Sequence, residues 1–128
     1  MNRQYEQMIE ELRRRVQEVT PEQARADVDG GKEVVLLDVR EPDEWARGRI
    51  PGAVHVPLRS VGFRCNPTSP TADARLTGHR DQRVVVYCAR GNRSLMAADA
   101  LKKMGYQDVV SMKGGIVDWA REGYPVER

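Results

Sequence analysis

The chain has 128 residues, a length typical of one domain that can bury a hydrophobic core without disulfide bonds. Its 21 Lys and Arg residues nearly balance its 19 Asp and Glu residues, so the formal net charge of +2 gives no overall field that would indicate nucleic-acid binding. No apolar stretch resembles a secretion signal or approaches the length of a membrane span, and the 2 cysteines are too few for a disulfide framework. We therefore expect a soluble, cytoplasmic protein that binds neither nucleic acid nor membranes.

The first segment predicts an amphipathic helix that extends to residue 19. Its apolar residues recur at helical spacing on one face, whereas charged residues fill most of the other face. The apolar positions are Tyr5, Met8, Ile9, Leu12, Val16 and Val19. This stripe can pack on the body of the same domain, or it can serve dimerisation or partner docking, so a monomer and a homodimer are both open. We treat residues 1–19 as an extension of a domain that spans residues 20–127.

Helices and strands alternate along the rest of the chain. Thr20, Pro21 and Gln23 form a helix-start signature, and this short helix is expected to end at residues 30–31. The following segments are expected as a strand at 34–39, a short helix at 41–48, a strand at 53–56, a long loop at 59–70, a helix start at 71–76, a strand at 83–87, a helix at 94–104, a strand at 108–111 and a helix at 116–122.

This alternation favours a mostly parallel sheet that is covered by helices on both faces. In such sheets the ligand site lies beyond the carboxyl ends of the strands. The segments that follow the expected strands are 38–40, 58–65, 88–93 and 112–115. We therefore expect these segments to share one rim of the sheet.

One of these segments places a cysteine between a buried strand and a helix. Cys88 at a helix N-terminus would meet unpaired N–H groups and the positive end of the helix dipole, so the thiolate is favoured over the thiol. Arg90 and Arg93 can hold an incoming oxyanion, and Gly91 permits a tight turn. These features outweigh the alternative of a buried, inert cysteine.

Several segments match one family in the same order along the chain. The matching segments are Leu-Leu-Asp-Val-Arg-Glu-Pro-Asp-Glu-Trp at 36–45, Ile-Pro-Gly-Ala-Val-His-Val-Pro at 50–57, the cysteine loop at 88–94, Lys-Gly-Gly-Ile at 113–116, Trp119 and Gly-Tyr-Pro-Val at 123–126. Over roughly residues 20–127 the chain resembles the single-domain rhodaneses, which are thiosulfate:cyanide-type sulfurtransferases. The resemblance implies a rhodanese-like α/β fold with a central, mostly parallel five-stranded sheet, helices on both faces and an extra N-terminal helix.

The resemblance also implies a site and a reaction. Cys88 would be the catalytic nucleophile and would carry a persulfide. Thiosulfate would supply the sulfur, and a thiol or cyanide would accept it, while a protein could also serve as donor or acceptor. The implied substrate-binding residues are Ala89, Arg90, Gly91, Asn92, Arg93 and Ser94. Asp38 and Arg40 are expected to support the site, and neither a cofactor nor a metal is expected.

Other interpretations of the same residues stay open. A cysteine phosphatase or arsenate reductase uses similar groups, but such phosphatases have one more residue between cysteine and arginine than Cys88 and Arg93 enclose. A sulfur carrier or protein-binding module could use the same cysteine. Cys65 is expected to be an incidental loop cysteine, although it could attack a persulfide on Cys88. His55 is expected to be structural and His79 exposed.

Overall fold

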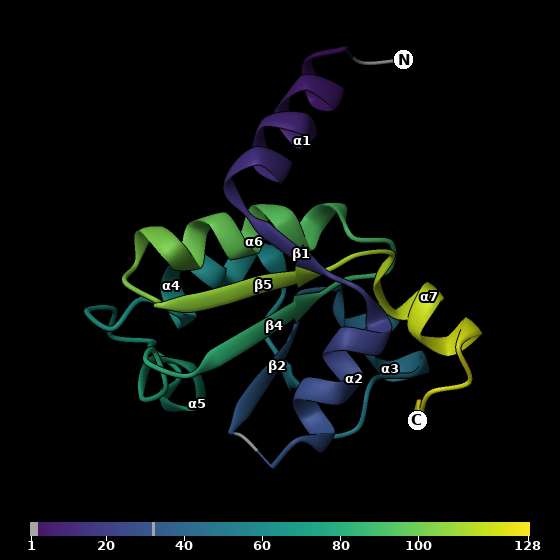
Figure 1. The fold of residues 1–128 in the computed structure, drawn as a ribbon. Helices are drawn as coiled ribbons and strands as arrows, with labels where there is room; N and C mark the ends of the chain where they lie inside the picture. The colour runs from purple at the N-terminus through teal and green to yellow at the C-terminus, as the bar shows by residue number, and fades with distance from the viewer. Residues whose placement is uncertain (1–2, 32) are drawn as a thin grey trace.

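The computed structural model describes residues 3–31 and 33–128, and its centre is a five-stranded sheet (Figure 1). The strands are β1 (Gln17–Val19), β2 (Val34–Asp38), β3 (Val54–His55), β4 (Arg83–Tyr87) and β5 (Asp108–Met112). Their order is β1-β5-β4-β2-β3, and each neighbouring pair is parallel. The parallel five-stranded sheet predicted from the resemblance is confirmed.

Helices cover both faces of this sheet. They are α1 (Arg3–Arg15), α2 (Pro21–Asp29), α3 (Pro42–Arg47), the 3-10 helix η1 (Leu58–Ser60), α4 (Val61–Arg64), α5 (Ala74–Thr77), α6 (Asn92–Lys103) and α7 (Gly115–Arg121). Because side chains alternate along a strand, neighbouring residues of β4 enter different cores. Val84 and Val86 pack with residues of α1, α4 and α6, whereas Val85 packs with residues of α2 and α7. The predicted two-sided helix cover is confirmed.

The helix-start signature at Thr20 has the expected geometry. The Thr20 hydroxyl accepts the Gln23 N–H at 3.1 Å, and the Gln23 side chain accepts the Thr20 N–H at 2.9 Å. This reciprocal cap satisfies two donors that the first turn of α2 would otherwise leave unpaired.

The N-terminal helix is shorter than the sequence pattern predicted. It ends at Arg15. Gln17–Val19 forms the strand β1, which the sequence pattern did not indicate and which pairs with β5. The prediction of a helix through residue 19 was wrong because its last apolar residues fit a short strand as well as a helical stripe. Pairing with the edge of β5 then satisfies the backbone polar groups of these residues.

The inner part of the predicted apolar stripe packs on the body of the same domain, whereas Tyr5 and Met8 near its outer end are 41% and 38% exposed. Ile9, Leu12 and Val16 are each at most 4% exposed and belong to the core that α6 covers. Arg15 also pairs with Asp99 of α6 at 3.2 Å. The outer end of α1 projects beyond the sheet and α6 (Figure 1).

The segment at 59–70, which was expected to be a long loop, contains η1 and α4. Val61 and Cys65 are buried there, at 2% and 0% exposure. A buried loop would leave its backbone polar groups unpaired, whereas these helical turns satisfy them locally. His79 is partly buried, so its expected exposure was also wrong.

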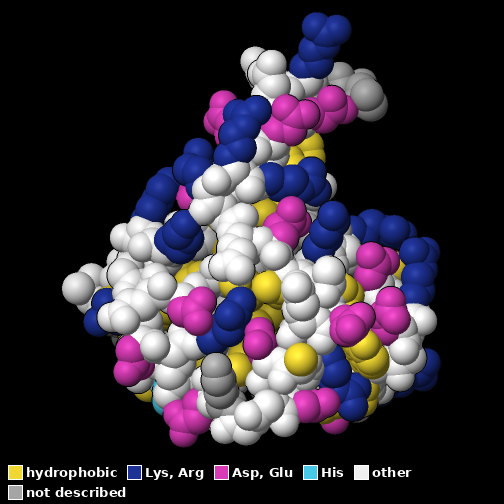
Figure 2. Space-filling model, in the orientation of Figure 1, with side chains coloured by type: hydrophobic (Ala, Val, Ile, Leu, Met, Phe, Trp, Pro, Cys, Tyr) yellow, Lys and Arg dark blue, Asp and Glu magenta, His cyan; other side chains and the backbone are white. Residues whose placement is uncertain are grey.

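The sequence predicted that basic and acidic residues would be interspersed. On the face shown in Figure 2, side chains of both signs are intermixed. Of the helices in residues 3–31 and 33–128, none combines the length and the apolar character needed to cross a membrane.

Candidate active site

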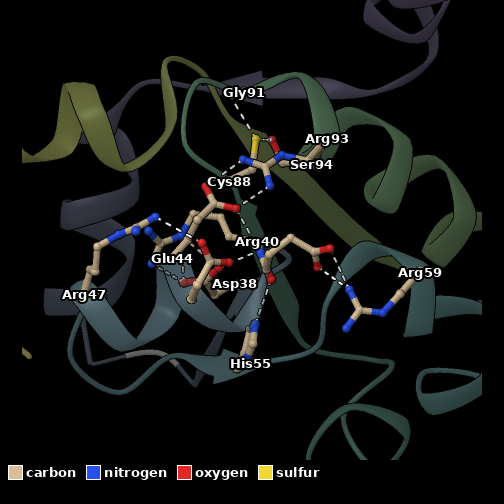
Figure 3. A network of polar contacts seen from close by, with 12 residues as sticks. Asp38, Arg40, Glu44, Arg47, His55, Arg59, Cys88, Gly91, Arg93 and Ser94 are labelled. Carbon is tan, nitrogen blue, oxygen red and sulfur yellow. Dashed lines mark hydrogen bonds and ion pairs between the residues drawn. The ribbon is translucent and has the colours of Figure 1, made fainter.

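Cys88 directly follows β4, and only 1% of the residue is exposed. The backbone N–H of Gly91 donates to its Sγ at 3.1 Å, and the Ser94 hydroxyl lies 3.5 Å from the same sulfur (Figure 3). Ser111 of β5 donates to the Ser94 hydroxyl oxygen at 2.8 Å. Among these contacts, the Gly91 N–H is the donor that can stabilise negative charge on the sulfur.

The N-terminus of α6 is directed at this loop. α6 has 12 residues, begins at Asn92 and is preceded by Gly91 in the left-handed region with φ of 105°. A side chain at Gly91 would also approach the backbone nitrogen of Gly114 to 3.1 Å. Glycine thus meets a conformational and a steric requirement, and the helix that begins here directs the positive end of its dipole at the cysteine loop.

The N-terminus of α7 holds the start of the cysteine loop. The Ile116 N–H donates to the Cys88 carbonyl oxygen at 2.9 Å, and the Val117 N–H donates to the Ala89 carbonyl oxygen at 3.1 Å. A Cβ atom at Gly115 would lie 2.3 Å from the Cys88 carbonyl oxygen and 2.4 Å from the Ala89 carbonyl oxygen. Close backbone contact, which only glycine allows here, therefore fixes Cys88 and Ala89.

Arg93 of the loop is paired with Glu44 of α3. Its Nη1 and Nη2 atoms donate to the two carboxylate oxygens at 2.7 and 3.0 Å. This hydrogen bonding lowers the pKa of Glu44 to about 2 and raises the pKa of Arg93 above its usual value. The sequence predicted that Arg93 would attract an anion and also brace the loop. Glu44 balances the charge of Arg93 in the structure, and the role of Arg93 toward an anion stays a prediction.

The other predicted loop residues differ in exposure. Arg90 is exposed and forms no ion pair with the residues that the structure describes. Ala89 and Asn92 are partly buried, whereas Gly91 and Ser94 are buried. Arg90 is therefore the loop arginine whose charge is available to solvent.

Asp38, the last residue of β2, and Arg40, which lies two residues later, form a buried ion pair. Asp38 is 0% and Arg40 6% exposed, and the Arg40 Nη2 atom lies 2.8 Å from Asp38 Oδ2. The same Nη2 atom donates to the Gly48 carbonyl oxygen at 2.6 Å. His55 Nε2 contacts the Arg40 carbonyl oxygen at 2.7 Å, and its ring stacks on Trp45. These contacts join β2, β3 and α3, while the supporting role of the pair in catalysis stays a prediction.

Cys65 is a core residue rather than a loop residue. It is fully buried, and this burial raises the pKa of its thiol to about 12. The Tyr106 hydroxyl donates to its carbonyl oxygen at 2.8 Å. A thiol in this environment is a poor nucleophile at neutral pH, which weighs against attack by Cys65 on a persulfide.

The sequence interpretation assigned no role to Glu44, Ser111 or Gly115. Ser111 offered a signal, since it is a polar residue inside an apolar strand, and Gly115 belongs to a glycine pair that follows a strand. Glu44 lies in the matching segment at 36–45, but nothing in the sequence indicated its partner, which is 49 positions away.

The described residues, with position 32 and the first two positions set aside, contain no group of three or more His, Cys, Asp or Glu side chains that could hold a metal ion.

Comparisons with known proteins show what this chain is similar to. The rhodanese-like domain family matches residues 20–122. A sulfurtransferase from Allochromatium vinosum is 33% identical over 111 residues, which cover 87% of this chain and 94% of that protein. Thiosulfate sulfurtransferase GlpE from Pseudomonas aeruginosa is 36% identical over 111 residues, which cover 87% of this chain and 89% of that protein.

A solved structure resembles almost the whole chain. It is a protein of unknown function from Rhodopseudomonas palustris, described as a possible tyrosine phosphatase, with a TM-score of 0.89 and 32% identity. The match covers 99% of this chain and 96% of that one. Together with the family match over residues 20–122, these findings show that the chain belongs to the rhodanese-like domain family.

Proposed function

We propose that this protein is a thiosulfate sulfurtransferase that carries the transferred sulfur as a persulfide on Cys88. The observation that supports this most directly is the Cys88 sulfur, which accepts the Gly91 N–H at 3.1 Å beside the N-terminus of α6. The family match and the sulfurtransferase names of the relatives support sulfur transfer as the general activity. The donor, the acceptor and the residue roles given below are the proposal.

In the first half-reaction, the Cys88 thiolate attacks the outer sulfur of thiosulfate. A sulfur–sulfur bond forms on Cys88 while the sulfur–sulfur bond of thiosulfate breaks, and the electron pair leaves with sulfite. Sulfite is a stable anion, so this step needs no general acid. Hydrogen bonds donated by the loop stabilise the negative charge, which is on the Cys88 thiolate before the attack and on sulfite after it.

The two loop arginines have different roles in this proposal. Arg90 is exposed, so it attracts the anionic donor. Arg93 positions the loop, because Glu44 holds its guanidinium at two points. Backbone N–H groups from Ala89 to Ser94 surround the bound sulfur.

In the second half-reaction, an acceptor thiolate or cyanide attacks the outer sulfur of the persulfide. The bond between this sulfur and Cys88 breaks, and the electron pair returns to the Cys88 thiolate. The enzyme is thus regenerated without a redox cofactor.

Intact mass spectrometry tests this proposal. Purified protein is incubated with thiosulfate and then with cyanide, with Cys88→Ser and Cys65→Ser measured in parallel. We expect the mass to rise by one sulfur atom, to return after cyanide, and to stay unchanged only in Cys88→Ser. No gain on Cys88 in the wild type would overturn thiosulfate as the donor and direct the search to protein persulfides.

A cysteine phosphatase is the second candidate, because the similar Rhodopseudomonas palustris protein is described as a possible tyrosine phosphatase. Two observations weigh against it here: the short spacing between Cys88 and Arg93, and the ion pair that occupies Arg93. Hydrolysis of p-nitrophenyl phosphate that is lost in Cys88→Ser would support the phosphatase and contradict our assignment.

A further inference from the structure

A cavity of about 350 Å³ opens directly beside the cysteine loop, between α3 and α7. Ala89, the residue after Cys88, forms part of its wall. This volume lies within the range of sites that bind small organic molecules and is far larger than one sulfur atom or cyanide requires. The cavity can therefore hold a larger reactant beside Ala89 of the cysteine loop.

The two sides of this cavity differ in chemistry. Ile116, Val117 and Ala120 of α7 form an apolar wall. Arg40, Glu44 and Arg47 contribute charged groups from the side of α3. Such a lining suits a molecule that has both an apolar body and a charged end, rather than a small oxyanion.

Only one of these charged side chains is readily available to a ligand. Arg40 is held by buried Asp38, and Glu44 is held by Arg93 at two points. Among the described residues, Arg47 forms one ion pair, with Asp43 at 3.2 Å. Both side chains are more than two-thirds exposed, at 73% and 71%. Because an exposed pair contributes little free energy, an incoming carboxylate can replace Asp43 at small cost.

We propose that this cavity binds the sulfur acceptor, that the acceptor is a low-molecular-weight organic thiol with an apolar body and a carboxylate, and that Arg47 binds the carboxylate. The inference rests on the proposed sulfurtransferase function. The apolar body of the acceptor lies against α7, and the acceptor thiolate attacks the outer sulfur of the Cys88 persulfide. The acceptor leaves as a persulfide, the electron pair returns to Cys88, and the proton of the acceptor thiol goes to solvent.

The acceptor step is measured alone in single-turnover experiments. Protein is loaded with persulfide, freed of donor and mixed with 3-mercaptopropionate or with 2-mercaptoethanol, which lacks the carboxylate. Quenched samples are read by intact mass. The matched variants are Arg47→Gln and Arg121→Gln, since Arg121 is equally exposed at 74% and pairs with Asp118 on a neighbouring turn.

We expect Arg47→Gln to slow transfer to 3-mercaptopropionate by about threefold to fivefold, the effect of losing one exposed ion pair. Transfer to 2-mercaptoethanol should not change, and Arg121→Gln should alter neither rate. Each thiol is compared with itself across the variants, so differences in thiol acidity cancel. Equal slowing of both thiols, or no slowing by Arg47→Gln, would overturn the role of Arg47.

A second variant tests the apolar wall. Ala120 is exposed on α7, and leucine is a good helix former, so Ala120→Leu fills part of the cavity with little risk to folding. We expect transfer to the bulky thiol 4-mercaptobenzoate to slow more than transfer to 3-mercaptopropionate. An identical effect on the two thiols would place the acceptor elsewhere.

The loading step separates this inference from the proposed function. Loading is done with thiosulfate and, independently, with inorganic polysulfide. If thiosulfate fails while polysulfide succeeds, the proposed donor is wrong and the acceptor experiment still decides the role of the cavity. If neither reagent forms a persulfide on Cys88, both proposals are overturned.

Discussion

Arg93 of the cysteine loop and Glu44 of α3 form a two-point ion pair, with nitrogen–oxygen distances of 2.7 and 3.0 Å. The two residues are 49 positions apart in the sequence. The pair joins the first turn of α6 to α3 and thereby limits the conformations of the loop that contains Cys88. It also explains why the pKa of Glu44 is lowered to about 2, since Arg93 hydrogen-bonds its carboxylate.

Glu44→Gln should therefore lower the free energy of unfolding in a pH-dependent way. A carboxyl group with a lowered pKa stabilises the fold above its ordinary pKa of 4.5 and loses this contribution as the pH falls towards 2. We expect the variant to be less stable by about 1 kcal/mol at pH 7, and the difference to shrink below pH 4.5. Urea unfolding between pH 3 and pH 7 measures it. Asp29→Asn, in an exposed pair with Arg25, is the control, and a difference that does not depend on pH would contradict this explanation.

Asp38→Asn should cost far more stability than loss of an exposed ion pair. Arg40 is 6% exposed, so the variant leaves a buried positive charge without its partner. We expect the free energy of unfolding to fall by about 3–5 kcal/mol. Urea unfolding of the variant is compared with Asp43→Asn, whose exposed pair contributes at most about 1 kcal/mol. Similar losses in the two variants would show that burial does not determine the contribution of these pairs.

Gly115→Ala should disturb the cysteine loop as well as the stability of the protein. The added Cβ would lie 2.3 Å from the Cys88 carbonyl oxygen, at a residue whose φ is +59°. Gly52→Ala is a matched control, because Gly52 has a φ of +84° but nothing within 4 Å of the added atom. We expect the control to lose about 1 kcal/mol from backbone strain and Gly115→Ala to lose at least about 2 kcal/mol. Only Gly115→Ala should also slow persulfide formation, and unchanged kinetics would show that the loop tolerates the displacement.

Cys65 should resist alkylation in the native protein. Its thiol is fully buried and its pKa is raised to about 12, so the reactive thiolate is scarce at pH 8. Iodoacetamide at pH 8, followed by peptide mapping, should label Cys65 only after urea has unfolded the chain. Rapid labelling of Cys65 in native protein would contradict its burial and would reopen a role for this thiol in the reaction.

Leu12→Ala tests whether the N-terminal helix belongs to the folding unit or forms a separate extension. Leu12 is 4% exposed and lies in the core that α6 covers. We expect a loss of about 2–5 kcal/mol in one cooperative transition, whereas Met8→Ala, at a residue that is 38% exposed, should change stability by at most about 0.5 kcal/mol. Urea unfolding followed by circular dichroism gives both values. Two separate transitions would support an extension at 1–19 that folds apart from the domain.

Local patterns were enough to predict much of this protein. The valine run at 84–86 predicted a buried strand, the residues after it predicted a helix, and Cys88 between them predicted a nucleophile at a helix N-terminus. Side-chain periodicity, caps and turn residues act over a few positions, so these features can be read from neighbouring residues. The order of the matching segments was then enough to indicate the resemblance to the family.

Tertiary structure decided the features that depend on distant residues. Gln17–Val19 became a strand because the edge of β5 was available for pairing, although its apolar spacing also suits a helix. Arg93 was paired with Glu44, and Cys65 was buried, because packing brought α3, α4 and α6 around the ends of the strands. The sequence by itself predicted most of the elements and proposed Cys88 as the nucleophile. Only long-range packing determined which charges are balanced, how deeply Cys65 is buried and where a cavity opens beside Ala89.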